Sequence, residues 1–287
     1  MSGPPVRVAS VTTRNIAIAL HVLRPDAVAA AAEFADEVSG RDGIACWLRP
    51  EGVEALAPLV RRPGELRTIA SPVSHELELV VVFGGDGTIL RAAEWALPAQ
   101  VPVLGVNLGH VGFLAELEPS QLDELIDRVL ARRYRVEERL CLHVELRDSP
   151  GGEVVWSSYA INEVSLEKAA RERMIEVLVQ IDGHPLQRWG TDGVLVSTPT
   201  GSTAYAFSAQ GPVMWPDLDA LLVVPLLAHA LFARPLVLSP TSVVSIEMLR
   251  GQSTSGVLCC DGRRSVDVAV GSEVVVRRLR QNLRIAR

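Results

Sequence analysis

The sequence ELELVVVFGGDGTIL, residues 76–90, joins an apolar run to a cluster of glycines. The continuous run at 76–83 predicts a strand that is covered on both faces. The string Gly84-Gly85-Asp86-Gly87-Thr88 predicts a sharp turn after that strand, because glycine tolerates backbone conformations that other residues avoid. A helix is expected to start near Thr88, whose hydroxyl can cap it. This strand–turn–helix order indicates a layered α/β unit.

The pattern repeats on both sides of this stretch. Buried strands are predicted at 15–23, 44–48 and 101–107, and helices at 26–38 and 119–132. The segment 50–75 contains four prolines and is expected to be irregular. The alternation predicts an α/β N-terminal domain with a parallel sheet in Rossmann- or flavodoxin-like layers.

After Arg133 the pattern changes to short alternating pieces bounded by Gly, Asp or Pro. Such pieces are typical of antiparallel strands and turns. The sequence therefore predicts two domains, an α/β domain at 1–134 and a β-rich domain at 135–287. The most apolar segment, 220–238, is interrupted by prolines and charges, so no membrane span is expected.

Composition excludes several classes of function. The net charge of −6 argues against a nucleic-acid binder. Lys168 is the only lysine among 28 basic residues, and no Gly-Lys-Ser/Thr occurs, which excludes a Walker-type loop. The four cysteines are too scattered for a disulfide framework, and the adjacent Cys259 and Cys260 are expected to pack in a strand. With no signal peptide apparent, a soluble cytoplasmic protein is expected.

The turn at 84–88 is the first candidate site. Free N–H groups at a helix start, together with the helix dipole, suit phosphate oxygens. Asp86 is unusual there, because a carboxylate repels phosphate. It is therefore a candidate general base for an attacking hydroxyl, or a Mg²⁺ contact. A plain Asp-Gly turn is the alternative.

Three further strings carry polar groups. NLGHVGFL at 107–114 follows a strand, where the carboxyl edge of a parallel sheet forms ligand crevices; His110 is expected to line that loop rather than act as a base. Asn162-Glu163 offers donors and acceptors for ribose hydroxyls or a base edge. Arg173 could reach a phosphate or lie in solvent.

The longest string runs from Thr191 to Ser208, TDGVLVSTPTGSTAYAFS. An apolar strand enters a dense cluster of hydroxyls and glycine, followed by an aromatic residue. This loop is expected to offer short donors to a polar ligand, and Tyr205 could cover an adenine or nicotinamide ring. A solvent-exposed Ser/Thr turn is the alternative, which the flanking apolar residues disfavour.

Together these strings resemble the NAD kinase family, which phosphorylates the adenosine 2′-hydroxyl of NAD to give NADP. The likeness covers about residues 78 to 265 and is strongest to actinobacterial members. GGDGT alone also occurs in lipid and sphingoid-base kinases. Its combination with Asn162-Glu163 and the 191–205 string is specific for NAD kinases.

The resemblance implies roles for individual residues. Asp86 is implied as the catalytic proton acceptor. The implied NAD contacts are Asp86, Gly87, Asn162, Glu163, Arg173, Asp192, Thr203, Ala204, Tyr205 and Ser208. The implied phosphate loop for ATP comprises Gly84, Gly85, Gly87, Thr88 and Arg91. Mg²⁺ or another divalent cation is expected with ATP, and no structural metal site is expected.

The resemblance also implies NAD and ATP as substrates, no nucleic-acid or membrane partner, and a homodimer or homotetramer. Inorganic polyphosphate is a second donor to consider. The sequence departs from the family at Gln210, where glycine is usual, and at Leu226-Leu227, where small or polar pairs occur. The chain also ends at Arg287, before a C-terminal tail that usually packs on the first domain. A lipid or sphingoid-base kinase and a non-catalytic NAD-binding protein are the alternatives.

Overall fold

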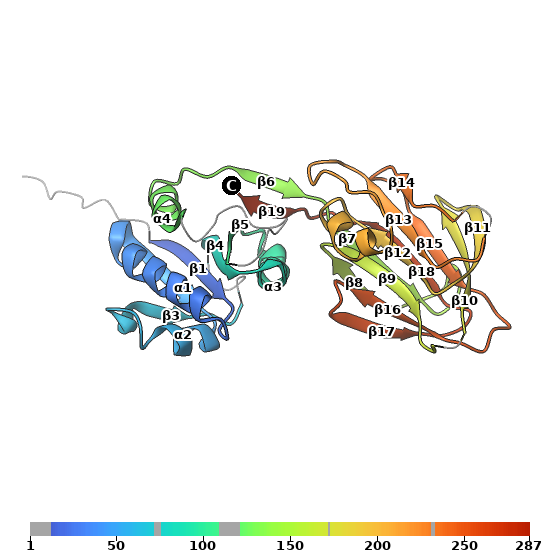
Figure 1. The fold of residues 1–287 in the computed structure, drawn as a ribbon, viewed down its shortest axis with the longest axis horizontal. Helices are drawn as coiled ribbons and strands as arrows, with labels where there is room; N and C mark the ends of the chain where they lie inside the picture. The colour runs from blue at the N-terminus through green and yellow to red at the C-terminus, as the bar shows by residue number, and fades with distance from the viewer. Residues whose placement is uncertain (1–12, 72–75, 109–120, 172, 231–232) are drawn as a thin grey trace, which may run out of the picture. The chain divides into compact units, whose positions relative to one another are not determined.

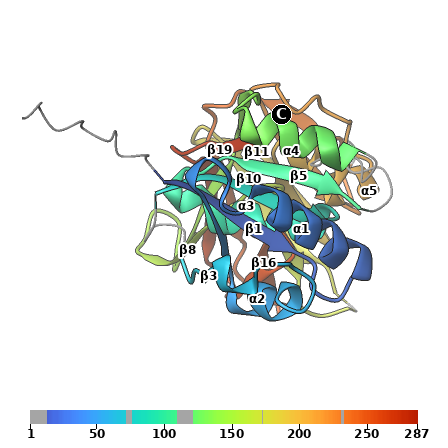
Figure 2. The same cartoon turned by 90° about the vertical axis from the view of Figure 1, so that its left-hand side faces the viewer.

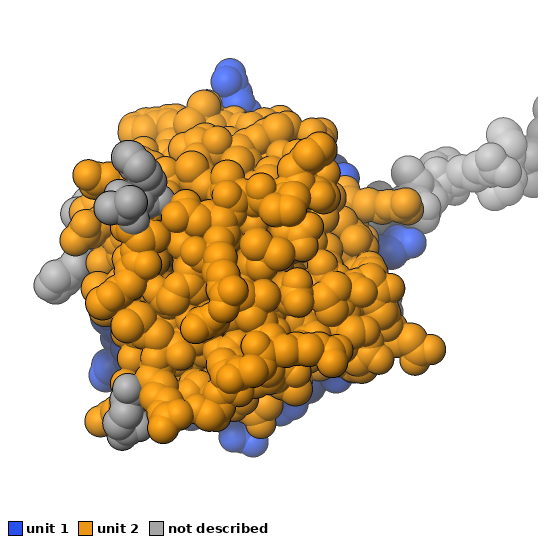
Figure 3. All heavy atoms as spheres, turned by 90° about the vertical axis from the view of Figure 1, so that its right-hand side faces the viewer, with its two compact units in different colours: residues 1–137, 284–287 blue, residues 138–283 orange. Residues whose placement is uncertain are grey.

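The computed structural model describes residues 13–71, 76–108, 121–171, 173–230 and 233–287. The chain divides into two compact units. Unit 1 comprises residues 1–137 and 284–287, and unit 2 comprises residues 138–283 (Figure 3). The chain therefore passes from one unit to the other twice.

Unit 1 is built on a seven-stranded sheet with the order β3-β2-β1-β4-β5-β19-β6 (Figure 1). Its strands are β1 (Arg14–Leu20), β2 (Ile44–Leu48), β3 (Leu66–Thr68), β4 (Leu77–Gly84), β5 (Val103–Asn107), β6 (Val136–Arg139) and β19 (Leu283–Ala286). Strands β1 to β5 pair in parallel, and β19 is parallel to β5. The predicted parallel α/β fold is confirmed.

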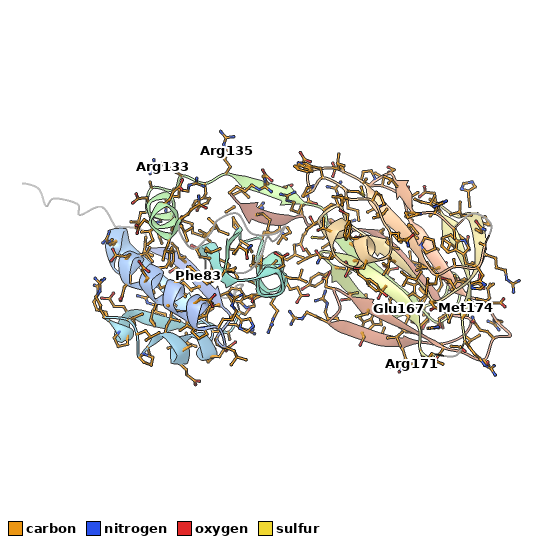
Figure 4. All side chains as sticks on the ribbon, in the orientation of Figure 1. Phe83, Arg133, Arg135, Glu167, Arg171 and Met174 are labelled. Atoms are coloured by element: carbon orange, nitrogen blue, oxygen red, sulfur yellow. The ribbon has the colours of Figure 1, made fainter. Side chains whose placement is uncertain are left out.

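Both faces of β4 are buried, as its apolar run predicts. Leu79, Val81 and Phe83 share one core with residues of α1 (Pro25–Val38) and α4 (Leu122–Leu130); Figure 2 labels both helices. Within this core the centroids of the Phe34 and Phe83 rings lie 5.6 Å apart; Figure 4 labels Phe83. The alternate residues Val80 and Val82 are also fully buried, and α3 (Asp86–Ala96) packs on β4 and β5. Successive side chains of a strand point to opposite faces of the sheet. Because the side chains of β4 are apolar on both faces, both faces must pack against other elements.

An ion pair joins the start of β1 to β4, and the same arginine bonds to the end of α4. Arg14 donates to both carboxylate oxygens of Glu78, at 2.6 and 2.8 Å, and to the carbonyls of Val129 and Leu130. Burial acts to raise the pKa of Glu78, but the bonds from Arg14 and Tyr134 outweigh it and lower the pKa to about 2. The arginine thereby donates to two carbonyls in the last turn of the helix, where acceptors lack the full set of helical partners.

Two expectations for unit 1 need correction. The helix expected near Thr88 begins at Asp86, with Gly85 as its N-cap. The segment 50–75 is not irregular, because it contains α2 (Pro50–Leu56) and β3. Proline is well suited to a first helical position, so Pro50 begins α2 rather than interrupting a helix. Within the predicted helix 119–132, the first two residues lie outside the described residues.

Unit 2 consists of two antiparallel six-stranded sheets. The first has the order β11-β10-β15-β18-β7-β8 and the second β14-β13-β12-β9-β16-β17. Their strands are β7 (Leu142–Arg147), β8 (Val154–Ala160), β9 (Glu163–Lys168), β10 (Ile175–Ile181), β11 (His184–Thr191), β12 (Gly193–Ser197), β13 (Leu221–Leu226), β14 (Leu236–Leu238), β15 (Val244–Met248), β16 (Gly256–Cys260), β17 (Arg264–Val268) and β18 (Glu273–Arg278). Alternate residues of both sheets form one apolar core. The predicted β-rich second half is confirmed.

Strand β13 was not predicted from the sequence, because Pro225 interrupts its apolar run. The structure pairs Pro225 with Val194 of β12, whereas β14 pairs only with residues 221–223 of β13. Proline is tolerated where its missing N–H faces no neighbouring strand. Pro225 therefore ends the β14 ladder without breaking the sheet.

The last strand, β19, joins the sheet of unit 1, although its residues were expected in the β-rich domain. Ile285 pairs with Val103, and the main chains of Arg135 and Arg287 exchange two hydrogen bonds of 2.7 and 2.8 Å. A segment near the end of the chain thus packs on the first sheet. A local pattern cannot show this, because the partner strand is far away in the sequence. No helix among the described residues is long and apolar enough to span a membrane.

Leu227 offers a test of backbone strain. Its φ is 47° and its side chain is 78% exposed. We expect Leu227→Asn to raise the free energy of unfolding by about 1 kcal/mol, because asparagine tolerates the left-handed region that costs leucine. Urea unfolding checks this. The neighbouring substitution Leu226→Asn is the control. Leu226 is buried, so its replacement should lower stability by at least about 2 kcal/mol. A loss of stability in Leu227→Asn would contradict the strain argument.

Candidate functional site

In unit 1, the predicted phosphate loop lies where β4 passes into α3. A Cβ on Gly84 would lie 2.7 Å from the Cβ and Oγ1 atoms of Thr88, so this contact requires glycine. Thr88 itself is buried in the first turn of α3. It packs on the strand end and does not cap the helix, which corrects the expectation for its hydroxyl.

The other glycines of this loop face open space. A Cβ on Gly85 or Gly87 would meet no atom within 4 Å. Asp86, Gly87 and Arg91 are exposed. The first N–H groups of an α-helix lack internal acceptors and lie at its positive end. This end of α3 can therefore receive an anion close to the backbone.

In unit 2, the candidate site lies on the outer face of the sheet that contains β9. Val164 and Leu166 point into the core between the sheets. The alternating residues Glu163, Ser165 and Glu167 point to the opposite face (Figure 4 labels Glu167). This arrangement gives β9 one apolar face and one polar face.

The turn before β9 is held by a single buried carboxylate. Asp261 accepts N–H bonds from Ile161 at 2.9 Å, from Asn162 at 2.7 Å and from Glu163 at 3.3 Å. Arg264 pairs with the same carboxylate at 3.0 Å. Asp261 thus fixes the backbone of both residues that the sequence selected, Asn162 and Glu163.

The hydroxyl-rich loop that follows β12 also forms hydrogen bonds to the turn before β9. Thr198 Oγ1 donates to the Ile161 carbonyl at 2.7 Å, and Ser197 Oγ donates to the Asn162 carbonyl at 3.1 Å. A Cβ on Gly201 would lie 2.1 Å from the Asn162 carbonyl oxygen, so this approach requires glycine. The expectation that these hydroxyls serve a ligand is therefore wrong for Ser197 and Thr198, which are fully buried and bond to the backbone.

Two acceptors in this turn have no partner. Asn162 Oδ1 and Glu163 Oε2 are buried and lack hydrogen bonds within the described part of the chain. Burial, and then the charge of Asp261, raise the pKa of Glu163 to about 7, although it accepts the Tyr205 N–H. A buried polar atom without a partner is costly. A ligand with hydroxyl donors could satisfy both oxygens.

Tyr205 lies beside this turn, at the start of α5 (Tyr205–Ser208). Its hydroxyl donates to Glu167 Oε2 at 3.2 Å, and its side chain is 39% exposed. Burial raises its pKa, as do the charges of Glu167, Glu163 and Asp192. The phenol is held at its tip while part of the ring remains available to a planar ligand.

The remaining predicted residues lie at different positions. Asp192 pairs with Lys168 at 2.7 Å, at the opposite end of β9 from Glu163. Arg173 is in the loop beyond that end and bonds to the Ser253 hydroxyl. Thr203, Ala204 and Ser208 flank Tyr205; Ser208 is exposed. The second glycine loop, including His110, falls among 109–120 and lies outside the described residues.

From the sequence, Asp261 was not selected as a site residue, and Gly201 was included only as part of the hydroxyl-rich string, without a role of its own. Asp261 and Gly262 have φ of 52° and 64°, in the turn between β16 and β17. Asp-Gly between two strands predicts such a hairpin turn. That local signal was available, but it does not reveal that the carboxylate reaches residues about 100 positions earlier.

The raised pKa of Glu163 gives a test by pH. Glu163 holds its proton in the native state up to pH near 7, whereas an ordinary glutamate loses it near 4.5. Stability from this proton is present below pH 4.5 and is lost as pH rises through 7. Relative to wild type, Glu163→Gln should therefore gain on the order of 3 kcal/mol in unfolding free energy between pH 4.5 and 8. Urea unfolding across this range checks it, with the exposed Glu153→Gln as control; parallel curves for Glu163→Gln and wild type would contradict it.

Asp261 gives a second test. Removal of its carboxylate leaves buried N–H donors and Arg264 without their acceptor. We expect Asp261→Ala to lower the free energy of unfolding by about 3–5 kcal/mol. Asp267→Ala on β17, where the side chain is exposed, should change it by less than about 0.5 kcal/mol. Equal effects in thermal or urea unfolding would refute the role given to Asp261.

Comparisons with known proteins place these features in one family. The family model for the ATP-NAD kinase N-terminal domain matches residues 53–134, and that for the ATP-NAD kinase C-terminal domain matches residues 161–287. The chain is similar to the crystal structure of yeast NADH kinase complexed with NADH, with a TM-score of 0.85 and 27% identity over 96% of this chain and 83% of that one. It is also similar to an NAD kinase from Archaeoglobus fulgidus in complex with ATP, with a TM-score of 0.68 and 25% identity over 94% and 92% of the two chains.

Curated sequences agree with these structures. The NAD kinase of Cutibacterium acnes is 55% identical over 275 residues, which cover 96% of this chain and 85% of that protein. The NAD kinase of Leifsonia xyli is 48% identical over 278 residues, covering 96% and 90%. The resemblance seen in the sequence motifs is confirmed, and this chain belongs to the NAD kinase family.

Proposed function

We propose that this chain is a phosphotransferase that moves the γ-phosphoryl group of ATP to the adenosine 2′-hydroxyl of NAD, giving NADP. The observation that carries the proposal is the pair of buried, unpartnered oxygens on Asn162 and Glu163, beside the half-exposed ring of Tyr205. Ribose hydroxyls and a planar base are the groups that such a set would bind. The relatives that bear the name NAD kinase support the same substrate.

In this function, the two halves of the chain bind different substrate groups. Residues 135–287 recognise NAD, with Asn162 and Glu163 as acceptors for ribose hydroxyls and Tyr205 against a ring. Asp192 and the stretch 203–208 complete the NAD contacts. Arg173 would have to leave its bond to Ser253 to contact a phosphate. Residues 1–134 hold the phosphate loop of Gly84, Gly85, Gly87, Thr88 and Arg91.

In the chemical step, Asp86 acts as the general base. The NAD 2′-oxygen forms a bond to the γ-phosphorus while the bond from that phosphorus to the β,γ-bridging oxygen breaks, releasing ADP. The proton of the 2′-hydroxyl passes to the Asp86 carboxylate. Catalysis of such transfers depends mainly on positioning the reactants and on neutralising the charge of the phosphates. The exposed start of α3 and the exposed Arg91 can contribute to neutralising that charge.

A divalent cation fits this site as a companion of ATP. No cluster of three His, Cys, Asp or Glu that could hold a metal was found among the described residues. Mg²⁺ commonly binds through substrate phosphates, waters and one or two carboxylates. Asp86, at the exposed start of α3, fits a single such contact. The cation would supply neutralisation of phosphate charge.

We further propose a homo-oligomer, as a dimer or tetramer, in the cytoplasm. Val213 and Trp215, at 55% and 72% exposed, are large apolar residues within one short segment of unit 2. Exposed apolar groups of this kind are typical of interaction surfaces. The composition supports neither a nucleic-acid nor a membrane partner.

Asp86→Asn tests the proposed function. We expect the variant to bind NAD as wild type does but to form NADP at least about 100-fold more slowly, because the general base is lost. NADP formation from NAD, ATP and Mg²⁺ is followed with an NADP-specific dehydrogenase, and NAD binding by calorimetry. Asp123→Asn is the matched control, since Asp123 is an exposed aspartate in the first turn of α4.

Other outcomes separate the alternatives. Near-wild-type turnover in Asp86→Asn would refute the base. If wild type binds NAD tightly but forms no NADP from ATP or from inorganic polyphosphate, the protein is a non-catalytic NAD-binding protein. Phosphorylation of a sphingoid base in place of NAD would favour the lipid-kinase alternative.

A further inference from the structure

The chain contains a single lysine, and this lysine lies beside the candidate site of unit 2. Of the 28 basic residues, Lys168 is the one that is not arginine. It is the last residue of β9, and Figure 4 labels Glu167 and Arg171 on either side of it in the sequence. Lysine and arginine differ in shape and in the directions of their donors. No step of the proposed reaction uses this ammonium group.

The ammonium group of Lys168 holds Asp192 in a close ion pair. Lys168 Nζ lies 2.7 Å from Asp192 Oδ1 and donates to the Arg171 carbonyl at 2.9 Å. The main chains are joined as well, because the Lys168 N–H donates to the Asp192 carbonyl at 2.9 Å and the Asp192 N–H donates to the Leu226 carbonyl at 3.0 Å. A compact ammonium can serve a carboxylate and a carbonyl at once. The backbone and the side chain of Asp192 are therefore both fixed.

Lys168 is the counter-ion in a group of carboxylates around Tyr205. Burial raises the pKa of Tyr205, and the charges of Glu167, Glu163 and Asp192 raise it further, so all three carboxyl groups lie within electrostatic reach of this phenol. Of the three, Asp192 alone pairs with a cation among the described residues. Glu167 accepts a hydrogen bond from the neutral Tyr205 hydroxyl. The face is therefore acidic, and one ammonium offsets part of its charge.

The ion pair is partly withdrawn from solvent. The side chains of Lys168 and Asp192 are 22% and 28% exposed. Charges that are partly buried are screened by salt and water less than charges on an open surface. Loss of the ammonium would leave the Asp192 carboxylate without its counter-ion, close to Glu167. Lys168 therefore sets the charge that a ligand meets at this end of β9.

We propose that Lys168 is a specificity-determining residue that adjusts the affinity of this site for oxidised relative to reduced dinucleotide. The oxidised nicotinamide ring carries a positive charge that the reduced ring lacks. An acidic face favours the form with that additional positive charge, and the Lys168 ammonium weakens this preference by neutralising Asp192. The ion pair thereby lets the site accept the more negative reduced form. The inference rests on the proposed function, because it requires that this face binds the dinucleotide.

The dissociation constants of NAD and NADH, measured by calorimetry at low ionic strength, test this inference. We expect Lys168→Met to raise the ratio of the NADH constant to the NAD constant by at least about threefold, because the uncompensated carboxylate repels the reduced form more strongly. Lys168→Arg should leave the ratio close to that of wild type, because it keeps the positive charge. Arg188→Met is the matched control, since it removes a cation from an exposed ion pair with Glu176 on the other sheet of unit 2.

Asp192→Asn gives a second test, which does not depend on the folding of Lys168→Met. This variant leaves the ammonium uncompensated, so the same ratio should fall below that of wild type. A residue that only supported the backbone would weaken the binding of both dinucleotides alike, and would not shift the ratio in opposite directions in the two variants. The Debye length falls from about 10 Å at 0.1 M salt to about 3 Å at 1 M, so both shifts should shrink at 1 M salt.

Three results would overturn the inference: equal weakening of NAD and NADH binding in Lys168→Met, the same shift of the ratio in Lys168→Arg, or a shift that persists at 1 M salt. NADP formation by the wild type, measured separately, distinguishes this inference from the proposed function. NADP formation with an unshifted ratio in Lys168→Met would keep the function and refute the inference. The expected ratios in a protein that forms no NADP would refute the function and keep the inference, and a wild type that binds neither dinucleotide would refute both.

Discussion

The candidate site of unit 2 depends on one carboxylate, that of Asp261. It accepts N–H bonds from three successive residues and pairs with Arg264. Ionised acceptors form stronger hydrogen bonds than neutral ones, so a single side chain can hold a whole turn. The cost is electrostatic, because its charge adds to burial in raising the pKa of Glu163. The group that orders the turn thereby also adds to the effect of burial in keeping its neighbour protonated.

The polar groups of this site divide into two classes. The hydroxyls of Ser197 and Thr198 bond to backbone carbonyls and make the loop rigid. Asn162 Oδ1 and Glu163 Oε2, in contrast, have no hydrogen-bond partner among the described residues. A buried oxygen without a donor is tolerated when the surrounding bonds hold it in place. The rigid turn therefore holds two buried acceptors in place, and in the function that we propose they meet the hydroxyls of NAD.

In unit 1, the candidate site is formed mainly by backbone groups rather than by buried side chains. Gly84 lets Thr88 pack against the strand end, and the open space at Gly85 and Gly87 leaves room at the start of α3. The same helix also places Arg91 and Trp95 in the lining of a cavity of unit 1. The start of α3 is thus open, and one side of the helix carries a basic and an aromatic side chain.

Periodicity and turn residues were sufficient for the parallel sheet of unit 1, the β-rich unit 2 and the helix after β4, because those signals act within a few residues. The motifs also selected Asp86, Asn162, Glu163 and Tyr205 as site residues. They could not show that β19 returns to the first sheet, or that Pro225 lies in a buried strand. The roles of the Ser197 and Thr198 hydroxyls were misread, and Asp261 was missed. Hydrogen bonds between residues distant in the chain decide which polar groups are consumed and which remain free, and only the tertiary structure brings those partners together.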